Sequence, residues 1–284
     1  MTSKKRVLIT GINGFTGRYV VARFLAEGCE VAGIGSQDSY GGPEPGVLYR
    51  RADLTDAADL AAAVASLRPT IVVHLAAIAF VGHADAEAFY KVNLLGTRNL
   101  LLALRALKQP LDAVILASSA NVYGVSRGGA LAETMPPAPA NDYAVSKLAM
   151  EHLAGTFRND LPIIVTRPFN YTGRGQSENF IVAKCVGHVR RRAPVIELGN
   201  IDVSRDFSDV RALADAYWRL AETAPVGATV NICSGVPHSL REILAMAQEQ
   251  AGHRIEIRVN PAFVRANEIP SLTGDPTLLH SLLP

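Results

Sequence analysis

Tyr143 and Lys147 stand four residues apart in a stretch with the pattern of a helix, so their side chains share one face. Asn141 and Asp142 are good N-cap residues, which predicts that the helix begins there. A phenol ordinarily has a pKa of about 10, and an ammonium group one turn away favours the phenolate. We therefore expect Lys147 to lower the pKa of Tyr143 and to make it a proton donor for a carbonyl oxygen. The pair alone is common on surface helices, so it needs a cofactor site and a third partner.

A glycine-rich turn near the start of the sequence could supply that cofactor site. It follows the apolar run Val7–Thr10 and precedes a helical pattern. Gly11 allows a tight turn, Gly14 lets the backbone approach a pyrophosphate, and Gly17 lets helix and strand pack closely. The helix N-terminus then faces the phosphates. The turn residues expected to bind a dinucleotide are Gly11, Asn13, Gly14, Phe15, Thr16 and Gly17.

The end of the second predicted strand indicates which dinucleotide binds. An acid that would bind the adenosine ribose is expected there, but the sequence has Gly35 and Ser36. A carboxylate would repel a 2′-phosphate, whereas glycine leaves room for one and Ser36 can hydrogen-bond it. NADP(H) is therefore favoured and NAD(H) is possible. Three cations could add charge, although the sequence does not place them: Arg18, Arg50 and Arg51.

The elements that position these residues alternate along the first half of the chain. Short β-branched runs predict strands at 6–10, 30–35, 70–75, 113–117 and 163–166, with a further short strand at 47–49. Between and after them, helices are predicted at 15–27, 56–67, 84–108, 142–158, 177–191, 209–222 and 239–251. This alternation is typical of an α/β fold, a Rossmann-type doubly wound parallel sheet. We expect residues 1–170 to form the NAD(P)-binding domain. Residues 171–284 should form mainly a smaller C-terminal substrate-binding lobe, with about 200–232 returning to the sheet.

Composition excludes several other classes of protein. The 284 residues carry a net charge of +2, and no run of about 20 apolar residues predicts a membrane span. We therefore expect no nucleic-acid or membrane partner. Cys29, Cys185 and Cys233 have neither disulfide nor metal-site spacing and are interpreted as buried apolar residues of a cytoplasmic protein without a metal. The basic run 190–192 is interpreted as a solvated helix end, with a ligand phosphate contact as the alternative.

Taken together, the glycine turn, Ser119 and the Tyr143/Lys147 pair resemble the extended short-chain dehydrogenase/reductase family, in its nucleotide-sugar branch. Within that branch, segments 141–148, 167–170, 199–207 and 231–235 resemble reductases of GDP-4-keto-6-deoxyhexoses; Arg174 departs from the proline common in this loop. The resemblance implies that Ser119, Tyr143 and Lys147 are catalytic. It also implies that Tyr143, Lys147 and these further residues contact the cofactor: Asp53, Leu54, Leu75, Ala76, Ala77, Asn93, Ser118 and Pro168.

The same resemblance implies a substrate side. The residues expected to bind a GDP-linked sugar are Ser119, Asn121, Asn170, Asn179, Lys184, Arg205, Arg265 and Glu268. Arg205 is a candidate clamp on the diphosphate, the alternative being an ion pair with Asp206 or Asp209. We interpret Tyr123 as a wall of the site and His74 as a structural histidine.

Fold does not choose among the reactions that such enzymes catalyse. Dehydratases of this branch place an acid soon after the catalytic serine or threonine, where this chain has Ala120 and Asn121. Neither can act as a general acid or base, so dehydration is disfavoured. The expected reaction is NADPH-dependent reduction of the 4-keto group of GDP-4-dehydro-6-deoxy-D-mannose, giving GDP-D-rhamnose or its talose epimer.

Two other functions stay open from the sequence. A nucleotide-sugar 4-epimerase with tightly bound NAD is the main alternative, and a non-catalytic NADP-binding regulator is less favoured because both Tyr143 and Lys147 are present. The family resemblance also implies a homodimer in which helices 84–108 and 142–158 of each copy form a four-helix bundle.

Overall fold

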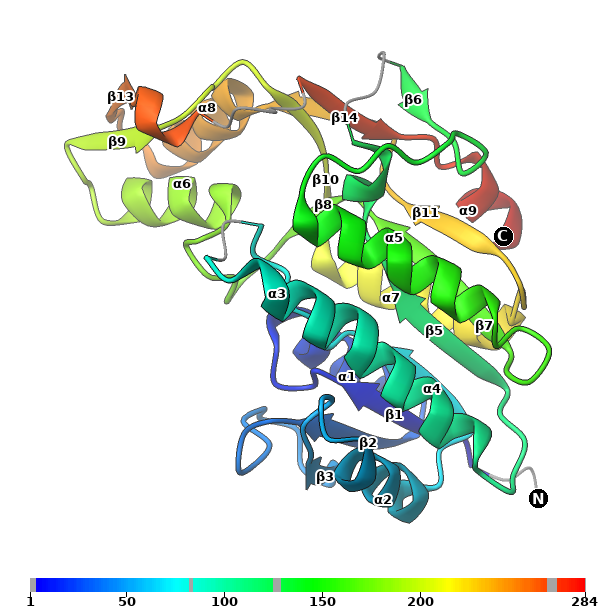
Figure 1. Cartoon of the computed structure of the whole chain (residues 1–284). Coiled ribbons are helices and arrows are strands. Elements are labelled where there is room, and N and C mark those ends of the chain that lie inside the picture. Colours follow the sequence, from blue (N-terminus) through cyan, green and yellow to red (C-terminus); the bar gives the residue numbers. More distant parts are fainter. Residues whose placement is uncertain (1–3, 82–83, 125–128, 265–269, 284) are drawn as a thin grey trace.

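A seven-stranded parallel sheet forms the centre of the computed structural model, which describes residues 4–81, 84–124, 129–264 and 270–283. Its strand order is β11-β7-β5-β4-β1-β2-β3 (Figure 1). The order reverses at β1, which has β2 on one side and β4 on the other. These strands are β1 (Arg6–Thr10), β2 (Glu30–Gly35), β3 (Leu48–Arg51), β4 (Ile71–His74), β5 (Ala113–Ala117), β7 (Ile163–Pro168) and β11 (Thr229–Ile232).

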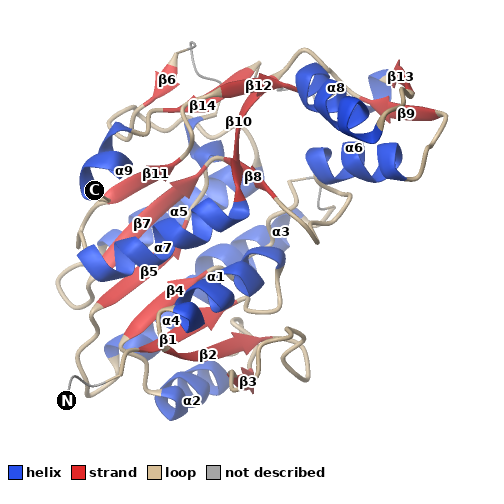
Figure 2. Ribbon diagram, turned by 180° about the vertical axis from the view of Figure 1, so that it is seen from behind, coloured by secondary structure: helices blue, strands red, loops and turns tan. Residues whose placement is uncertain are grey.

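Helices cover both faces of this sheet (Figure 2). One face packs against α1 (Phe15–Ala26) and α7 (Val210–Thr223), and the other packs against α2 (Ala57–Leu67), α4 (Thr97–Arg105) and α5 (Asp142–Gly155). Two separate apolar cores result. Successive side chains of a strand point to opposite faces, so in β1 Val7 joins the first core and Leu8 the second. The predicted α/β doubly wound fold is confirmed.

The long helix predicted over 84–108 contains an irregularity. It runs as α3 (Ala86–Phe89), a π-helical segment η1 (Tyr90–Gly96) and α4. Such segments are rare and are frequent at functional sites. Here η1 carries Asn93, one of the predicted cofactor residues. Periodicity alone gave no sign of this change, because the apolar pattern continues through it.

The second half of the chain builds a smaller region beyond the carboxyl ends of the main strands. In one part of it, the strands β9 and β13 pair in parallel and pack against α6 and α8, and the shared core includes Cys185 and Leu244. Another sheet has the order β12-β10-β14-β6, with β8 also paired to β10. The bounds are β6 (Ala130–Leu131), β8 (Asn170–Thr172), α6 (Ile181–Arg190), β9 (Val195–Leu198), β10 (Ser204–Asp209), β12 (Pro237–Ser239), α8 (Leu240–Ala251), β13 (Glu256–Val259), β14 (Ser271–Gly274) and α9 (Thr277–Leu282).

The carboxylate of Asp206 fastens this region together. It is fully buried on β10 and accepts hydrogen bonds from the backbone N–H and hydroxyl of Ser234, at 2.8 and 2.6 Å, and from the N–H groups of Gly235 and Gly274, at 2.8 and 3.3 Å. A buried carboxylate is costly without such donors. The division of the chain near residue 170 stays a prediction; in the structure β11 lies in the main sheet beside β7.

Other expectations from composition can be compared with the structure. Cys29, Cys185 and Cys233 are buried free thiols, as predicted. The basic run begins at the last residue of α6, and Arg191 pairs with Glu178 at 2.5 Å, in agreement with a solvated helix end. Within the described ranges, no helix combines the length and the apolar character needed to cross a bilayer.

Candidate active site

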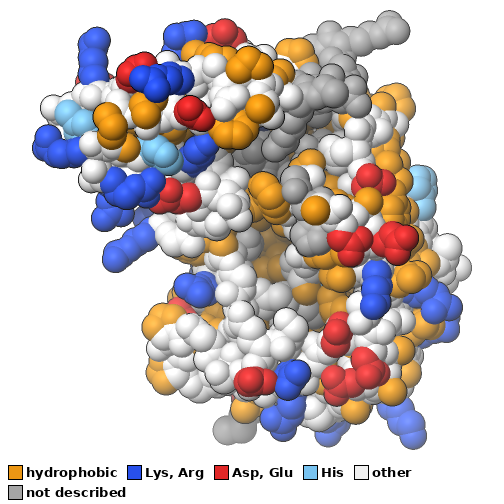
Figure 3. Space-filling model, turned by 60° about the vertical axis from the view of Figure 1, so that its left-hand side comes forward, with side chains coloured by type: hydrophobic (Ala, Val, Ile, Leu, Met, Phe, Trp, Pro, Cys, Tyr) orange, Lys and Arg blue, Asp and Glu red, His pale blue; other side chains and the backbone are white. Residues whose placement is uncertain are grey.

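The carboxyl ends of the central strands bring most of the predicted residues to one edge of the sheet. β1 runs into the glycine turn, β4 into Leu75–Ala77, β5 into Ser118–Ser119, and β7 ends at Pro168. Ligands of open α/β sheets bind at this edge, next to the point where the strand order reverses. The space-filling view shows the surface hollowed between the main sheet and the smaller region (Figure 3).

The proposed catalytic side chains come from α5 and from the turn after β5. Asn141 caps α5, its side-chain oxygen accepting the N–H of Ala144 at 2.9 Å. The cap places Tyr143 and Lys147 in the first turns, where both are buried. The Ser119 side chain lies next to the Tyr143 phenol. Lys147 donates from Nζ to the carbonyl of Ala117 at 2.8 Å. The predicted trio is therefore brought together.

The electrostatics of the pair differ from the expectation that Lys147 lowers the pKa of Tyr143. Burial raises the pKa of Tyr143 to about 12, and the neighbouring Ser119 side chain opposes only part of that rise. Burial also lowers the pKa of Lys147 to about 8, against an opposing effect of the Glu151 charge. The expectation was wrong because residue spacing shows which groups are neighbours but not how far they are removed from water. In the structure the phenol is a neutral proton donor at pH 7.

The glycine turn has the geometry of a phosphate-binding loop. Gly11 has a φ of +67°, and a Cβ there would lie 2.8 Å from the backbone of Ala76. A Cβ on Gly17 would lie 2.5 Å from the carbonyl oxygen of Ile12, so only glycine allows α1 to pack so closely on the turn. The N-cap of α1 is Gly14, which has no side chain to bond the first N–H groups of the helix. Those donors suit a dinucleotide diphosphate.

The loop after β2 lies beside this turn. Asn13 holds it, donating to the carbonyl of Ser39 at 3.0 Å and accepting the N–H of Gly41 at 2.9 Å. Asn13 therefore supports the loop in addition to any contact with a cofactor. Gly35 pairs in register with Arg51 of β3, and Arg51 forms an exposed ion pair with Asp38 at 2.9 Å.

Two cations therefore lie on the strand next to Gly35, since Arg50 precedes Arg51 and is also exposed. A Cβ at Gly35 would lie 3.0 Å from the hydroxyl of Tyr49, which leaves little room for a side chain there. Ser36 is exposed at the start of the loop. These features suit an additional phosphate on the adenosine ribose better than a carboxylate–ribose contact.

Several predicted cofactor residues form hydrogen bonds within the protein. The amide of Asn93 accepts the N–H of Ile78 at 2.9 Å and donates to the Ile78 carbonyl and the Ser146 hydroxyl at 3.2 and 3.1 Å. Asn93 thus fastens the loop after β4 to α5. Asp53 is exposed and caps a turn through two 2.8 Å bonds from Thr55, which lower the pKa of its carboxyl.

The other predicted cofactor residues lie along the same edge. Leu54 is buried, its backbone carbonyl accepting a hydrogen bond from Asn99 at 2.9 Å. The N–H of Ala76 donates to the hydroxyl of Thr10 at 3.2 Å. Leu75, Ala77 and Pro168 are partly exposed at the ends of β4 and β7.

His74 is structural, as predicted. Its Nδ1 and Nε2 lie 2.6 and 2.8 Å from the hydroxyls of Thr10 and Thr97. Burial lowers its pKa to about 3, so the ring is neutral at physiological pH. It links β1, β4 and α4 below the catalytic edge.

The predicted substrate residues are only partly assembled. Asn121 follows Ser119, whose hydroxyl accepts its N–H at 3.2 Å, and Asn170 lies on β8 beside Phe207. Asn179 is exposed before α6, and Lys184 donates to the carbonyl of Glu197 at 2.7 Å. Arg265 and Glu268 lie outside the described residues.

The structure shows the hydrogen-bond partners of Arg205, the candidate diphosphate clamp, and of Tyr123, the expected wall of the site. Arg205 donates to its neighbour Ser204, while the carboxylate of Asp209 pairs with Arg211 at 2.5 Å. Tyr123 is buried, and its hydroxyl donates to Asn231 at 2.8 Å. That hydroxyl belongs to an internal hydrogen-bond network.

Sequence reasoning missed two groups of residues beside the site. Tyr171 hydrogen-bonds Thr16 at 2.9 Å and stacks on Phe15, with ring centroids 6.2 Å apart. Glu151 and Arg167 form a buried ion pair behind Lys147. Glu151 could have been found, because it continues the four-residue spacing of Tyr143 and Lys147. Nothing local indicates Tyr171, whose partners lie about 155 residues earlier.

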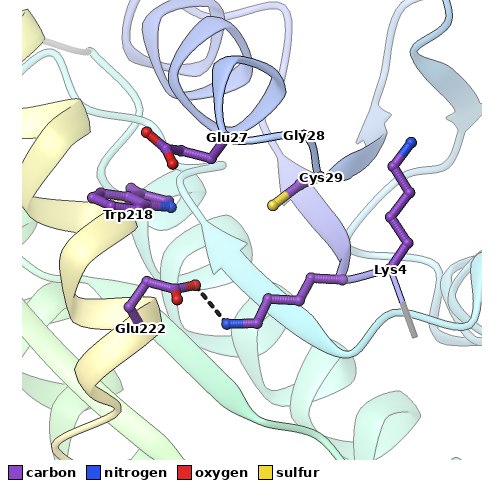
Figure 4. A pocket seen from close by; sticks show the side chains of 7 residues that line it. Lys4, Glu27, Gly28, Cys29, Trp218 and Glu222 are labelled. Atoms are coloured by element: carbon purple, nitrogen blue, oxygen red, sulfur yellow. Dashed lines mark hydrogen bonds and ion pairs between the residues drawn. The ribbon is translucent and has the colours of Figure 1, made fainter. Parts of the chain in front are cut away.

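A second surface feature lies at the opposite edge of the sheet. A groove of about 650 Å³ is lined by Cys29, Trp218 and the ion pair Lys5–Glu222, whose atoms are 2.5 Å apart (Figure 4). Lys5 and Cys29 precede β1 and β2, so the groove is remote from the carboxyl ends of the strands. Burial raises the pKa of the Cys29 thiol, which disfavours a nucleophilic role. The candidate active site is therefore the edge that carries Tyr143.

Residues 8–283 match the family model described as GDP-mannose 4,6 dehydratase. The chain belongs to this family. It is 35% identical over 278 residues to GDP-6-deoxy-D-talose 4-dehydrogenase of Aggregatibacter actinomycetemcomitans, covering 98% of this chain and 91% of the relative. It is also 35% identical over 287 residues to GDP-6-deoxy-D-mannose reductase of Pseudomonas aeruginosa, covering 97% and 90%.

Solved structures agree with this assignment. A candidate epimerase from Burkholderia cenocepacia is 48% identical with a TM-score of 0.92, covering 98% of this chain and 91% of that one. RMD from Pseudomonas aeruginosa, solved with NADPH, is 32% identical with a TM-score of 0.83, covering 99% and 92%. The predicted membership of the extended short-chain dehydrogenase/reductase family is confirmed.

Proposed function

We propose that this protein is an NADPH-dependent reductase that converts the 4-keto group of a GDP-4-keto-6-deoxyhexose into an alcohol. The observation that carries the proposal is the buried Ser119–Tyr143–Lys147 group at the carboxyl edge of the sheet, beside a glycine turn built for a dinucleotide. Two relatives of 35% identity over nearly the whole chain are named for redox chemistry on GDP-linked 6-deoxyhexoses.

Each of the three residues has a distinct part in the reaction. Tyr143 gives its proton to the carbonyl oxygen as negative charge develops there, and Ser119 hydrogen-bonds the same oxygen. Lys147, one helical turn along α5, holds the nicotinamide ribose. Bound NADPH supplies the hydride that the ketone carbon accepts. Because all three side chains are buried, their charges and dipoles act in a medium of low dielectric constant.

The cofactor assignment is supported by the residues around β2 and β3. The uncapped N-terminus of α1 suits the diphosphate, and Gly35 with the exposed Arg50 and Arg51 suits a 2′-phosphate. A solved relative carries NADPH. NAD(H) stays possible, and the ratio of kcat/KM for NADPH and NADH measures the preference. A strong preference for NADH would contradict this assignment.

Dehydration, the activity in the family's name, is not proposed for this chain. The two positions after Ser119 are Ala120 and Asn121. Ala120 is buried and has no group that can move a proton. Elimination of water from the sugar needs a general acid or base in addition to the tyrosine.

A nucleotide-sugar 4-epimerase is the second candidate, favoured by the likeness to the candidate epimerase from Burkholderia cenocepacia. An epimerase recycles its cofactor and needs no external reductant. Protein purified with stoichiometric NAD, together with no oxidation of added NADPH by a 4-keto sugar, would favour this function over a reductase.

One experiment tests the reductase directly. The protein is incubated with NADPH and GDP-4-keto-6-deoxy-D-mannose, and the product is identified by NMR. We expect stoichiometric oxidation of NADPH and formation of GDP-D-rhamnose or GDP-6-deoxy-D-talose, which differ only in the configuration at carbon 4. Recovery of the unchanged ketone, with NADPH intact, would contradict the proposal.

On the substrate side, Asn170, Asn121 and Arg205 are proposed to contact the nucleotide sugar.

The predicted homodimer is proposed to form through η1, α4 and α5. These helices lie side by side (Figure 1). Two apolar side chains on them, Leu95 and Val145, have 51% and 37% of their surface exposed to solvent. The three free thiols fit the proposed cytoplasmic location, where thiols stay reduced.

A further inference from the structure

A buried ion pair lies one helical turn beyond Lys147. Glu151 follows Lys147 by four residues on α5, and Arg167 lies on β7. Arg167 donates from Nε and Nη2 to the two carboxylate oxygens, at 3.0 and 2.7 Å. The side chains of Arg167 and Glu151 are only 7% and 9% exposed. Apolar residues of similar volume often replace such a pair without loss of stability, so stability alone is a weak explanation for its presence.

Glu151 also reaches the segment that carries the catalytic serine. The Ser118 hydroxyl donates to Glu151 Oε1 at 2.5 Å, and Lys147 donates to the carbonyl of Ala117 at 2.8 Å. Together with the contact between Tyr143 and Ser119, these bonds join α5 to three consecutive residues at the end of β5. A shift of Glu151 would therefore move the serine relative to the tyrosine.

The guanidinium of Arg167 contacts two partners. It pairs with Glu151 on one side and donates from Nη1 to the hydroxyl of Tyr123, at 3.0 Å, on the other. Tyr123 in turn donates to Asn231 on β11. Arg167 is thus fixed between α5 and the strand at the edge of the sheet. Arg167 and Lys147 belong to different elements, β7 and α5.

We propose that Glu151 and Arg167 are positioning residues of the reductase: Glu151 stabilises the ammonium charge of Lys147 and holds the Ser118–Ser119 segment, and Arg167 limits the attraction that Glu151 exerts. The inference deepens the proposed function and rests on it only for the role of Lys147.

The groups around Lys147 support this division of roles. His74 faces Lys147 from β4 and is neutral, with a pKa of about 3. Tyr143, on the same helix, is also neutral at pH 7. Burial lowers the pKa of Lys147 to about 8, and the negative charge of Glu151 raises it. Among the described residues, Glu151 is the negative charge that acts on Lys147, and the carboxylate of Glu151 is itself paired with Arg167.

Equilibrium unfolding as a function of pH tests the proposal without substrate or cofactor. The folded pKa of Lys147, about 8, lies below its ordinary value of 10.5, so the unfolded state binds more protons between these values. The free energy of unfolding therefore gains a term that rises with pH across this window. Buried thiols and phenols with raised pKa values oppose this rise above about pH 9, so the Lys147 term is the difference between the curves of the wild type and of Lys147→Met. The pH at which that difference begins to rise reports the folded pKa of Lys147.

Two variants should move that onset in opposite directions. Glu151→Gln removes the negative charge, and we expect the onset to fall by roughly one pH unit. Arg167→Gln leaves Glu151 to act on Lys147 alone, and the onset should rise. The alkaline limb of kcat/KM should move in the same two directions. A purely structural pair would lower stability in both variants without opposite shifts, and that result would overturn the proposal.

Three controls distinguish the effect of the Glu151 charge on Lys147 from effects on folding and on the position of the Ser118–Ser119 segment. In a Lys147→Met background, neither substitution should change the pH dependence. Ser118→Ala keeps all charges but loses the bond to Glu151, so it should lower kcat without moving the alkaline limb. If Glu151→Gln does not fold, the double variant Glu151→Gln/Arg167→Gln avoids a buried unpaired cation. It should show an onset below that of the wild type, and an unchanged onset would contradict the role of Glu151.

Failure of this inference differs visibly from failure of the proposed function. A wild-type protein that does not oxidise NADPH with the 4-keto sugar would contradict the reductase, whatever the unfolding data show. An active wild-type protein whose variants lack the opposite shifts would contradict only the role of Glu151 and Arg167.

Discussion

The phenol of Tyr143 is buried against Ser119 and is neutral at pH 7, so it can donate a proton but gains little from the nearby lysine in becoming a phenolate. Tyr143→Phe removes only the hydroxyl. We expect turnover to fall roughly a hundredfold or more, with the Kd for NADPH little changed. Steady-state kinetics with the 4-keto sugar and a fluorescence titration of NADPH measure the two quantities.

A matched control for that variant is Tyr90→Phe. The Tyr90 hydroxyl is exposed to solvent and donates at 2.7 Å to Asp142, the first residue of α5. It should retain wild-type turnover within a small factor. Equal losses in both variants would remove Tyr143 from the mechanism.

His74 should make the protein sensitive to mild acid. Its folded pKa of about 3 lies below its ordinary value of 6.5, so the unfolded state binds more protons between these values. The contribution of His74 to stability is complete above pH 6.5 and is lost as the pH falls, with a slope of at most about 1.4 kcal/mol per pH unit.

Urea unfolding of the wild type and of His74→Asn at pH 7, 6 and 5 measures this effect. The variant is expected to be less stable at pH 7, because the bonds to Thr10 and Thr97 are altered, but to lose less stability on acidification. Parallel pH profiles for the two proteins would contradict a buried neutral histidine.

At the scale of elements, the N-terminal half of α1 contacts β8 and the residues that follow it. Thr16 bonds Tyr171 at 2.9 Å, Phe15 stacks on the same tyrosine, and Tyr19 donates to the carbonyl of Arg174 at 2.8 Å. One element belongs to the proposed cofactor side and the other carries Asn170 of the proposed substrate side. The contacts should therefore couple the two.

A double-mutant cycle of Thr16→Val and Tyr171→Phe measures the coupling. We expect an interaction of roughly 0.5–1.5 kcal/mol in the free energy of unfolding. The pair Thr16→Val and Tyr90→Phe serves as the reference and should be additive. Additivity in both cycles would show that the hydroxyl–hydroxyl contact contributes nothing.

Six of the seven strands of the main sheet were predicted, most of them because buried parallel strands are continuous apolar runs. The seventh, β11, was not among the predicted strands, although residues 200–232 were expected to return to the sheet. β1, β2 and β5 have the predicted bounds. By contrast, β6 and β8 contain two and three residues and form only because partners distant in sequence lie beside them. The Tyr143/Lys147 pair was predicted from its spacing and Ser119 from the family resemblance, whereas the pKa of Tyr143 and the contact of Tyr171 with Thr16 depend on burial and on long-range packing.

At the scale of the whole molecule, the proposed dimer can be tested at one exposed side chain. Leu95 lies on η1 and is 51% exposed. Leu95→Glu would place a charge in the proposed four-helix interface and should shift the mass toward the monomer in light scattering at micromolar concentration. Leu48→Glu, at a 61% exposed position on the edge strand β3, is the control and should leave the mass unchanged. A monomeric wild type would contradict the dimer.

The main sheet also separates the two apolar cores of the molecule. Val7 and Leu8 are neighbours in the chain, yet they belong to different cores. Phe24 of α1 lies in the first core and Leu104 of α4 in the second. Cavities made by Phe24→Ala and by Leu104→Ala should therefore destabilise the fold independently, and the two losses should add. Mutations in the core between the sheet and the helices α1 and α7 can therefore be compensated within that core, without a change in the layer that includes α5 and its proposed catalytic residues.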